Sequence, residues 1–178
     1  MFYMEKVKLS INNSEENKLP SNIEAEQSLI GSVLVNNDII DEISNIVSSG
    51  KFFDPIHRKI YEVIENLNNK GMIANPITLK NYFENDSGLS EVGGVDYLVK
   101  LTRFSSSIKQ AIDYAKLVHE MYVKRELIFI SDGIEDQAKD DQIEKTGENI
   151  IEDAEKSLFD LAERGNFSQT FLKFNQAL

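Results

Sequence analysis

Two histidines are the side chains of this sequence best suited to acid–base or metal chemistry. His57 and His119 lie far apart in the 178 residues, and the chain has no Cys that could supply a thiolate ligand. His119 is followed by Glu120, but the second histidine that a zinc-binding H-E-x-x-H helix requires is missing. We therefore expect no metal site, a capping or packing role for His57, and a solvent-facing or hydrogen-bonded His119.

Paired carboxylates are the other candidates for acid–base chemistry. Glu24 with Glu26 and Asp140 with Asp141 are examples. Two carboxylates act as an acid and a base only when a pocket pushes their pKa values apart. One pair lies at a predicted helix start and the other in a predicted loop, so we expect both pairs to be solvated. The sequence thus predicts no catalytic residue.

The glycines do not form a nucleotide-binding loop. A phosphate loop requires G-x-x-x-x-G-K-[ST], because backbone N–H groups and a Lys must converge on the phosphates. The glycine spacing occurs from Gly88 to Gly93, but Gly94 stands where the Lys is required, and neither G-x-G-x-x-G nor G-x-S-x-G occurs. We expect no cofactor in this chain and no enzymatic activity of its own.

The charge of the chain argues against a nucleic-acid-binding surface. There are 30 Asp and Glu against 19 Lys and Arg, a net charge of −11, and neither half of the chain is basic. DNA-binding proteins place Lys and Arg against the phosphates, and single-strand binders combine such cations with aromatic residues. We interpret Tyr61, Tyr82 and Tyr97 as core or interface residues, and the acidic excess as a source of solubility or of attraction for a basic partner.

The sequence also predicts the cellular compartment, through the absence of two kinds of targeting segment. No stretch is apolar over the length needed to cross a membrane. The N-terminus lacks the charged and apolar segments of a secretion signal. We expect a cytoplasmic protein without a membrane partner.

Helix start signals divide the N-terminal part of the chain into short helices. Ser21 or Asn22 can cap a helix, and Asp54-Pro55 and Asn75-Pro76 each pair a capping side chain with a proline suited to the first helical position. Apolar residues at helical spacing follow each signal. The pattern predicts a helical globule over residues 20–106, with helices over about 38–48 and 76–85 among others, after a disordered tail over residues 1–19.

The second half of the chain predicts a long helical hairpin over residues 107–164. Ser107 caps a run without Pro that extends to about Lys139, and Thr146 caps a second helix after a short polar connection. Two helices joined by a short loop fold back antiparallel to one another. The predicted fold is therefore all-α, a compact bundle of short helices followed by a long antiparallel hairpin.

The hairpin carries more apolar residues than two helices bury against one another. A lone pair of helices is marginal in water, and leaving its remaining apolar residues exposed would create a sticky patch. The hairpin packs either against its own bundle or against another chain, and we favour the second alternative. The residues expected to carry this dimerisation contact are Leu127, Ile128, Ile130, Ile134, Ile151, Ala154 and Leu158.

Short motifs occur along the chain in a distinctive order. They are Pro20 to Ser28 with Gly31; Phe52 and Phe53 with His57, Ile60 and Tyr61; Gly71; Ile77 to Leu79; Leu89 with Val92 to Gly94, Tyr97 and Leu98; Tyr114 and Ala115; Arg125 and Glu126; and Ala154 and Glu155 with Phe159. Together they resemble the N-terminal domain of bacterial DnaB-type replicative DNA helicases over about residues 20–163. Asn75-Pro76 and residues 104–110 depart from the family pattern, which leaves the loop geometry there open.

The resemblance implies that the chain is one part of a larger motor. The full-length family protein is a hexameric, ATP-driven helicase, and its RecA-like motor domain follows this domain and holds the phosphate loop with ATP and Mg²⁺. This chain lacks that loop, so we expect it neither to bind ATP nor to unwind DNA. Residues 165–178 would begin the linker toward the motor domain.

The resemblance also implies partners. In the family the hairpins pair between subunits, and the pairs form a trimer-of-dimers collar that supports ring assembly in DNA replication and docks the C-terminal domain of primase. We therefore expect the chain to self-associate and to bind primase, with a helicase loader as a further candidate partner. We expect no strong direct binding to DNA. Glu24, Glu91, Tyr97 and Arg125 lie on matching motifs and are candidates for primase docking or for control of the collar's state, although Tyr97 is equally well explained as a core tyrosine.

Two other functions remain open from the residues alone. A free-standing helical adaptor without a helicase parent fits the same helices and the same lack of an active site. A helical DNA-binding module would bind DNA tightly and lose affinity steeply with salt. The negative charge of the chain disfavours this second alternative.

Overall fold

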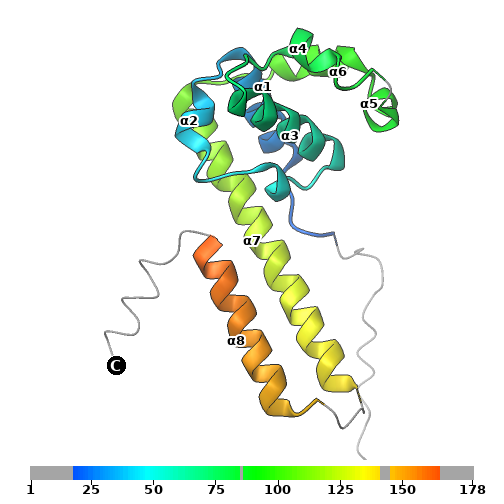
Figure 1. The fold of residues 1–178 in the computed structure, drawn as a ribbon, viewed down its shortest axis with the longest axis vertical. Helices are drawn as coiled ribbons and strands as arrows, with labels where there is room; N and C mark the ends of the chain where they lie inside the picture. The colour runs from blue at the N-terminus through cyan, green and yellow to red at the C-terminus, as the bar shows by residue number, and fades with distance from the viewer. Residues whose placement is uncertain (1–17, 85, 141–144, 165–178) are drawn as a thin grey trace, which may run out of the picture.

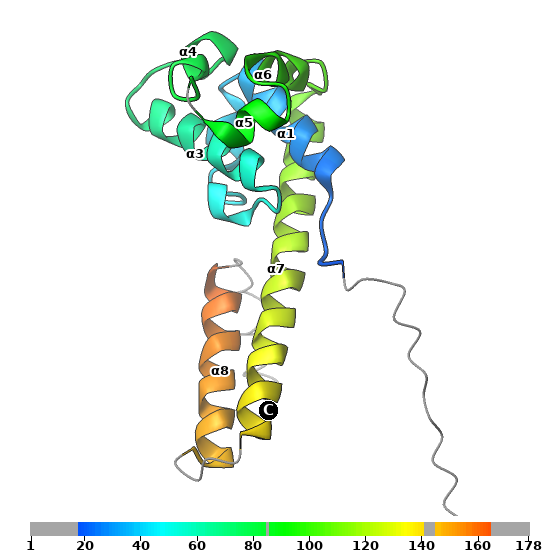
Figure 2. The ribbon, with the colours of Figure 1, turned by 90° about the vertical axis from the view of Figure 1, so that its right-hand side faces the viewer.

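The fold consists of a helical globule from which a long helical hairpin projects (Figures 1 and 2). The computed structural model describes residues 18–84, 86–140 and 145–164, and within these ranges every regular element is a helix. The predicted all-α fold is confirmed. The predictions for the tail before residue 18 and for the linker over residues 165–178 lie outside the described residues.

The predicted caps begin the first helices of the globule. The Asn22 side chain accepts a hydrogen bond from the Ala25 N–H at 2.9 Å, and α1 (Ile23–Val35) follows. The Asp54 side chain accepts from the Ile56 N–H at 2.8 Å, and α3 (Pro55–Asn69) begins with the proline, as predicted. Each cap satisfies a backbone N–H that has no partner within the helix.

Two helices are shorter than predicted. The helix expected over 38–48 is α2 (Ile39–Ile43), followed by a tight turn and the short 3-10 helix η1 (Ser49–Lys51). The helix expected over 76–85 is α4 (Pro76–Lys80), after which the Tyr82 and Phe83 N–H groups donate to carbonyls three residues earlier. Such bonds close a turn more tightly than an α-helix does, so the helices end there.

Two further short helices complete the globule. They are α5 (Ser87–Glu91) and α6 (Val95–Thr102). Gly93 and Gly94 join them with φ angles of 115° and 64°, a region that side chains with a Cβ rarely adopt. The two glycines therefore form the turn between α5 and α6.

The core of the globule draws on all of its main helices. Its largest fully buried side chains include Tyr61 and Phe52, whose rings lie 4.7 Å apart. Apolar burial of this kind is the main force that stabilises the fold, at about 1.5–3 kcal/mol for a large side chain. The first half of the long helix α7 (Ile108–Lys139) completes this core with Ala111, Ala115 and Val118.

The second half of α7 leaves the globule and pairs with α8 (Gly147–Arg164), which runs back toward the globule (Figures 1 and 2). The Ser107 side chain caps α7 in a reciprocal capping box with Gln110, as the sequence predicted for the start of this helix. The 32 residues of α7 span about 48 Å. One rigid rod therefore belongs to both the globule and the hairpin.

We expect Gly31→Ala to lower the free energy of unfolding by about 1–3 kcal/mol. Gly31 lies where α1 and α6 touch, and a Cβ there would collide with the backbone carbonyl oxygen of Leu101. Chemical denaturation measures the loss. The control is Gly133→Ala, where nothing lies within 4 Å of the added Cβ and a mid-helix alanine should stabilise α7 by about 0.5–1 kcal/mol. Equal effects of the two substitutions would contradict the close approach of α1 and α6.

Candidate functional site

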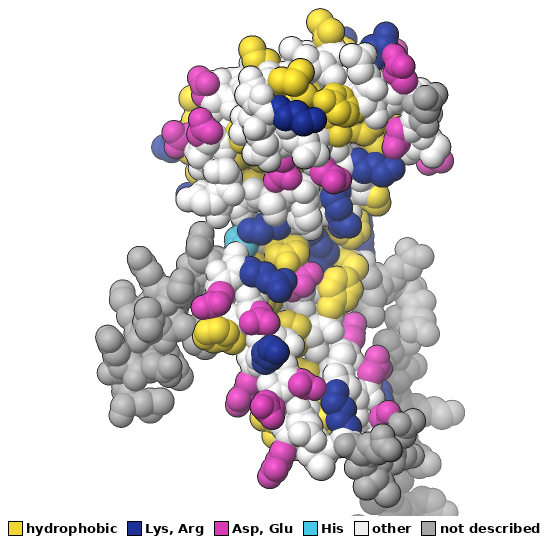
Figure 3. Space-filling model, viewed as in Figure 1, with side chains coloured by type: hydrophobic (Ala, Val, Ile, Leu, Met, Phe, Trp, Pro, Cys, Tyr) yellow, Lys and Arg dark blue, Asp and Glu magenta, His cyan; other side chains and the backbone are white. Residues whose placement is uncertain are grey.

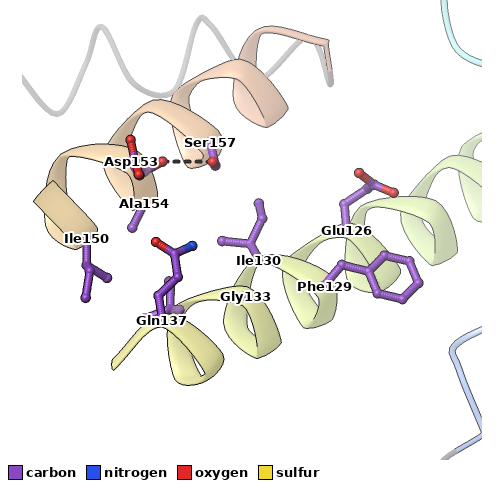
Figure 4. A pocket seen from close by; sticks show the side chains of 10 residues that line it. Glu126, Phe129, Ile130, Gly133, Gln137, Ile150, Asp153, Ala154 and Ser157 are labelled. Carbon is purple, nitrogen blue, oxygen red and sulfur yellow. Dashed lines mark hydrogen bonds between the residues drawn. The ribbon is translucent and has the colours of Figure 1, made fainter. Parts of the chain in front are cut away.

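The two arms of the hairpin enclose a shallow groove. It has a volume of about 260 Å³ and is lined by Ile130, Gly133 and Ile134 from α7 and by Ile150 and Ala154 from α8, among others. Figure 4 shows Ile130 pointing from α7 toward α8. These residues hold the arms of one hairpin together, so the groove belongs to the hairpin's own packing.

Other apolar side chains of the hairpin face solvent. Leu127 of α7 is exposed, and so are Ile151, Leu158 and Phe159 of α8, whereas Phe129 lines the groove and is also partly open to solvent. Ile151 is 61% exposed and Leu158 41%, and they lie about two helical turns apart on one face of α8. We call this pair the α8 stripe. Large apolar residues gathered on one projecting element are typical of a protein interaction surface.

The structure divides the predicted contact residues into two groups. Leu127, Ile151 and Leu158 are exposed, whereas Ile130, Ile134 and Ala154 line the groove between the arms and Ile128 is half-buried. The sequence did not separate these two groups, because the spacing of apolar residues does not show which of them face the other arm of the hairpin and which face solvent. Their role in a subunit contact stays a prediction.

A buried carboxylate lies where the globule meets the hairpin. Glu26 of α1 is only 2% exposed, and its oxygens accept hydrogen bonds from the Phe53 N–H at 2.6 Å, the Asp54 N–H at 3.3 Å and Nδ1 of His57 at 2.8 Å. A buried charge is tolerated only when such partners replace water. The expectation that Glu26 is solvated is therefore wrong.

The hydrogen bonds continue from His57 to α6. Because the Glu26 carboxylate accepts from Nδ1, Nε2 of His57 has no proton in the neutral ring and accepts from the Tyr97 hydroxyl at 2.7 Å. The Gln27 amide donates to the Tyr97 oxygen at 3.2 Å. Burial raises the pKa of Tyr97, so it remains a neutral donor. This cluster links α1, α3 and α6.

Arg125 links α7 to the same region. It is 5% exposed and donates to the carbonyl oxygens of Pro20 and Lys51, both at 2.7 Å. Its guanidinium lies 5.4 Å from the centre of the Phe53 ring. Burial lowers the pKa of Arg125, and the carboxylate of Glu26 opposes this effect. The arginine therefore fixes the angle at which α7 leaves the globule.

The predicted docking residues do not form one surface. Glu24 and Glu91 are exposed on α1 and α5, whereas Tyr97 and Arg125 are buried in the cluster and its neighbourhood. The two buried side chains are inaccessible to a docking partner in this arrangement. Any functional influence of these two side chains must act through the position of α6 and α7. Glu26, His57 and Tyr97 all lie in the motifs that resemble the helicase family, and this was the signal in the sequence that could have indicated the buried cluster.

Metal ligands do not gather in the described ranges, where no group of three or more His, Asp or Glu could hold a metal ion. His57, which was expected to cap or pack, is buried within the hydrogen-bonded cluster.

No helix among the described residues combines the length and the apolarity that crossing a membrane requires.

Residues 18–120 match the family model described as the DnaB-like helicase N terminal domain. The chain belongs to this family. A replicative DNA helicase DnaB of Rickettsia bellii is 41% identical over 155 residues, covering 87% of this chain and 31% of the relative. The DnaB of Pasteurella multocida is 33% identical over 150 residues, covering 82% of this chain and 31% of the relative. This DnaB N-terminal domain therefore spans about a third of the length of these relatives.

Solved structures show the same fold. The N-terminal domain of the DnaB helicase from Mycobacterium tuberculosis aligns with a TM-score of 0.72 at 24% identity, covering 80% of this chain and 99% of that one. A DnaB-like replicative helicase described together with its interactions with primase aligns with a TM-score of 0.62 at 21% identity, covering 86% of this chain and 35% of that one. The resemblance noted in the sequence is confirmed.

Proposed function

We propose that this domain is the collar of a replicative DNA helicase, in which it assembles the subunits through the hairpin and docks primase. The observation that carries the proposal is the exposed α8 stripe on a hairpin that projects from a well-packed globule. Burying that stripe against a second hairpin would remove apolar surface from water. The whole protein would then be an ATP-dependent DNA-unwinding motor that acts in the cytoplasm.

The assembly proposal rests on how the hairpin is built. Its groove residues already pack within one chain, so the exposed apolar residues are left for another chain. The rigid α7 rod and the Arg125 bonds hold the hairpin at a fixed angle to the globule. A fixed angle favours one closed arrangement of subunits over open association. We propose pairs of hairpins, and three such pairs in the full-length ring.

The primase proposal rests on a structural neighbour, a DnaB-like helicase described with its interactions with primase. The exposed candidates in this chain are Glu24 and Glu91. Both add to the acidic character of the domain, which has a net charge of −11 and would attract a basic partner surface. Tyr97 and Arg125 would act indirectly, by holding α6 and α7 in place.

Light scattering over a wide concentration range tests the assembly proposal. We expect a mass that rises from one chain of 20.2 kDa toward the mass of a pair as concentration increases. Titration with the C-terminal domain of primase should then add the mass of that partner, and Glu24→Lys with Glu91→Lys should weaken the added binding. A monomer at every concentration would contradict the assembly proposal. A paired domain that does not bind primase would contradict the docking proposal.

A further inference from the structure

A hollow lies where the end of α8 meets the globule. Its volume of about 380 Å³ falls within the range of about 300–1,000 Å³ that small-molecule sites occupy. It is lined by the loop between Ser44 and Lys51, by Tyr122 of α7 and by Arg164 at the end of α8, and by no acidic side chain of the described residues. We call it the junction hollow. In a chain with 30 Asp and Glu, such a hollow favours an anionic ligand over a cationic one.

Lys51 is a half-buried cation that forms no ion pair with an acidic side chain in the described ranges. Its ammonium donates to the Ile46 carbonyl oxygen at 2.8 Å and lies 6.0 Å from the centre of the Tyr122 ring. Burial lowers the pKa of Lys51, because the charge has lost part of its hydration. An anion placed in the junction hollow would compensate for that loss.

Arginines add to the positive charge around the junction hollow. Arg164 lines it and, like Lys51, forms no ion pair within the part of the chain that the structure describes. Arg125 donates to the Lys51 carbonyl oxygen at 2.7 Å, and the charge of Arg58 is near enough to lower the pKa of Arg125. Figure 3 shows Lys and Arg side chains gathered where the hairpin meets the globule. Nearby carboxylates offset part of this charge, but none of them lines the hollow.

The donors around the junction hollow suit a phosphate group. Arg164 supplies a guanidinium, Lys51 an ammonium, and Ser44 and Ser48 supply hydroxyl groups. Charge-assisted hydrogen bonds from Arg and Lys to phosphate are among the stronger hydrogen bonds in proteins. A phosphate group also has more acceptor oxygens than a carboxylate, so it can use more of these donors at once. The chain lacks a glycine-rich phosphate loop, and here side chains would replace it.

We propose that the junction hollow binds a phosphate group between Lys51 and Arg164, carried by inorganic phosphate or by a small phosphate ester. The inference does not rest on the collar proposal. Lys51 belongs to the globule and Arg164 to the hairpin, and α8 makes its extensive contacts with α7. A phosphate group held by both cations would therefore join the end of α8 directly to the globule. Binding of the ligand would fix the position of the second arm of the hairpin.

Titration of the complete 178-residue chain with inorganic phosphate tests this inference. Nuclear magnetic resonance should show shifts confined to the backbone amides between Ser44 and Lys51, around Tyr122 and at the end of α8. Arg164→Gln and Lys51→Met should each weaken binding about tenfold, because each removes a charge-assisted hydrogen bond. Calorimetry measures the dissociation constants, and circular dichroism checks that both variants keep their helices.

Adenosine monophosphate is the second probe, and it separates the two sources of the phosphate group. Affinity equal to that of inorganic phosphate would identify the phosphate group as the whole ligand. Tighter binding would identify an ester whose remaining atoms also contact the hollow. Either result supports the proposed site, provided that Arg164→Gln weakens the binding of both probes.

The matched control is Arg103→Gln, which removes one exposed charge at the end of α6, away from the junction hollow. It should change the dissociation constant for phosphate by less than about twofold, since an isolated surface charge contributes little. All titrations are made at one ionic strength set with chloride, because salt screens such interactions. Phosphate that binds no tighter than chloride would overturn the site. Equal losses from Arg103→Gln and Arg164→Gln would also overturn it, because the anion would then respond to the charge of the whole chain.

Discussion

Replacing Ile151 with Asp is expected to weaken self-association of the domain about 100-fold or more. Ile151 is 61% exposed on α8, and burying such a side chain in an interface contributes about 1.5–3 kcal/mol. A twofold pair contains the site twice, so both contributions are lost, and each tenfold change in affinity corresponds to about 1.4 kcal/mol. The buried carboxylate adds a desolvation cost. Sedimentation equilibrium of wild type and variant measures the ratio.

The matched control is Ile77→Asp. Ile77 is 81% exposed on α4, at the end of the globule away from the hairpin (Figure 1). The same chemical change there should leave both association and the free energy of unfolding close to the wild-type values. Equal loss of association in both variants would mean that exposed apolar residues drive association wherever they lie on the domain, and not through a specific contact of the hairpin. An unchanged mass for Ile151→Asp would contradict the hairpin contact.

Ile151 is a better test position than Ile134, although both are among the predicted contact residues. Ile134 lines the groove between α7 and α8, so a charge there would separate the arms of one hairpin. A loss of association would then have two explanations. Ile151 faces solvent in the single chain, and circular dichroism should show that its replacement leaves the helical content unchanged.

The sequence predicts the helices well wherever a local signal determines them. Asn22, Asp54 and Ser107 cap the helices assigned to them, because a cap involves residues only two or three positions apart. The two overlong predictions fail for a related reason. Ile46 and Tyr82 continue an apolar pattern after their helices have ended in tight turns, and apolar periodicity does not register the change in hydrogen bonding.

The buried polar cluster lies beyond the reach of such local signals. Glu26 and His57 are 31 residues apart, His57 and Tyr97 are 40 apart, and Arg125 bonds a carbonyl 105 residues earlier. In the sequence, Glu26 stands in the first turn of a helix beside Glu24, where an exposed acidic residue is favourable for the helix dipole. Only the packing of three helices around it reveals that one of the two is buried. The contrast between Glu24 and Glu26 provides the second large prediction.

We expect Glu26→Gln to lower the free energy of unfolding by about 3 kcal/mol, because a buried donor that loses its acceptor costs roughly 1–3 kcal/mol. One carboxylate oxygen accepts from the Phe53 N–H, and the other accepts from the Asp54 N–H and from His57. A Gln side chain has one oxygen, so its amide N–H₂ group must face at least one of these donors. Urea denaturation followed by circular dichroism measures the change.

Glu24→Gln is the control for this substitution, because it removes the same charge from the same helical turn. Glu24 is exposed, and only Glu26 accepts the buried donors. Glu24→Gln should therefore lower the free energy of unfolding by no more than a helix-dipole interaction contributes, about 0.3–1 kcal/mol. Similar losses in the two variants would mean that charge near the start of α1, and not acceptance by the buried carboxylate, stabilises the junction. A loss confined to Glu26→Gln would identify this carboxylate as the group that holds α1 to α3 and, through His57 and Tyr97, to α6.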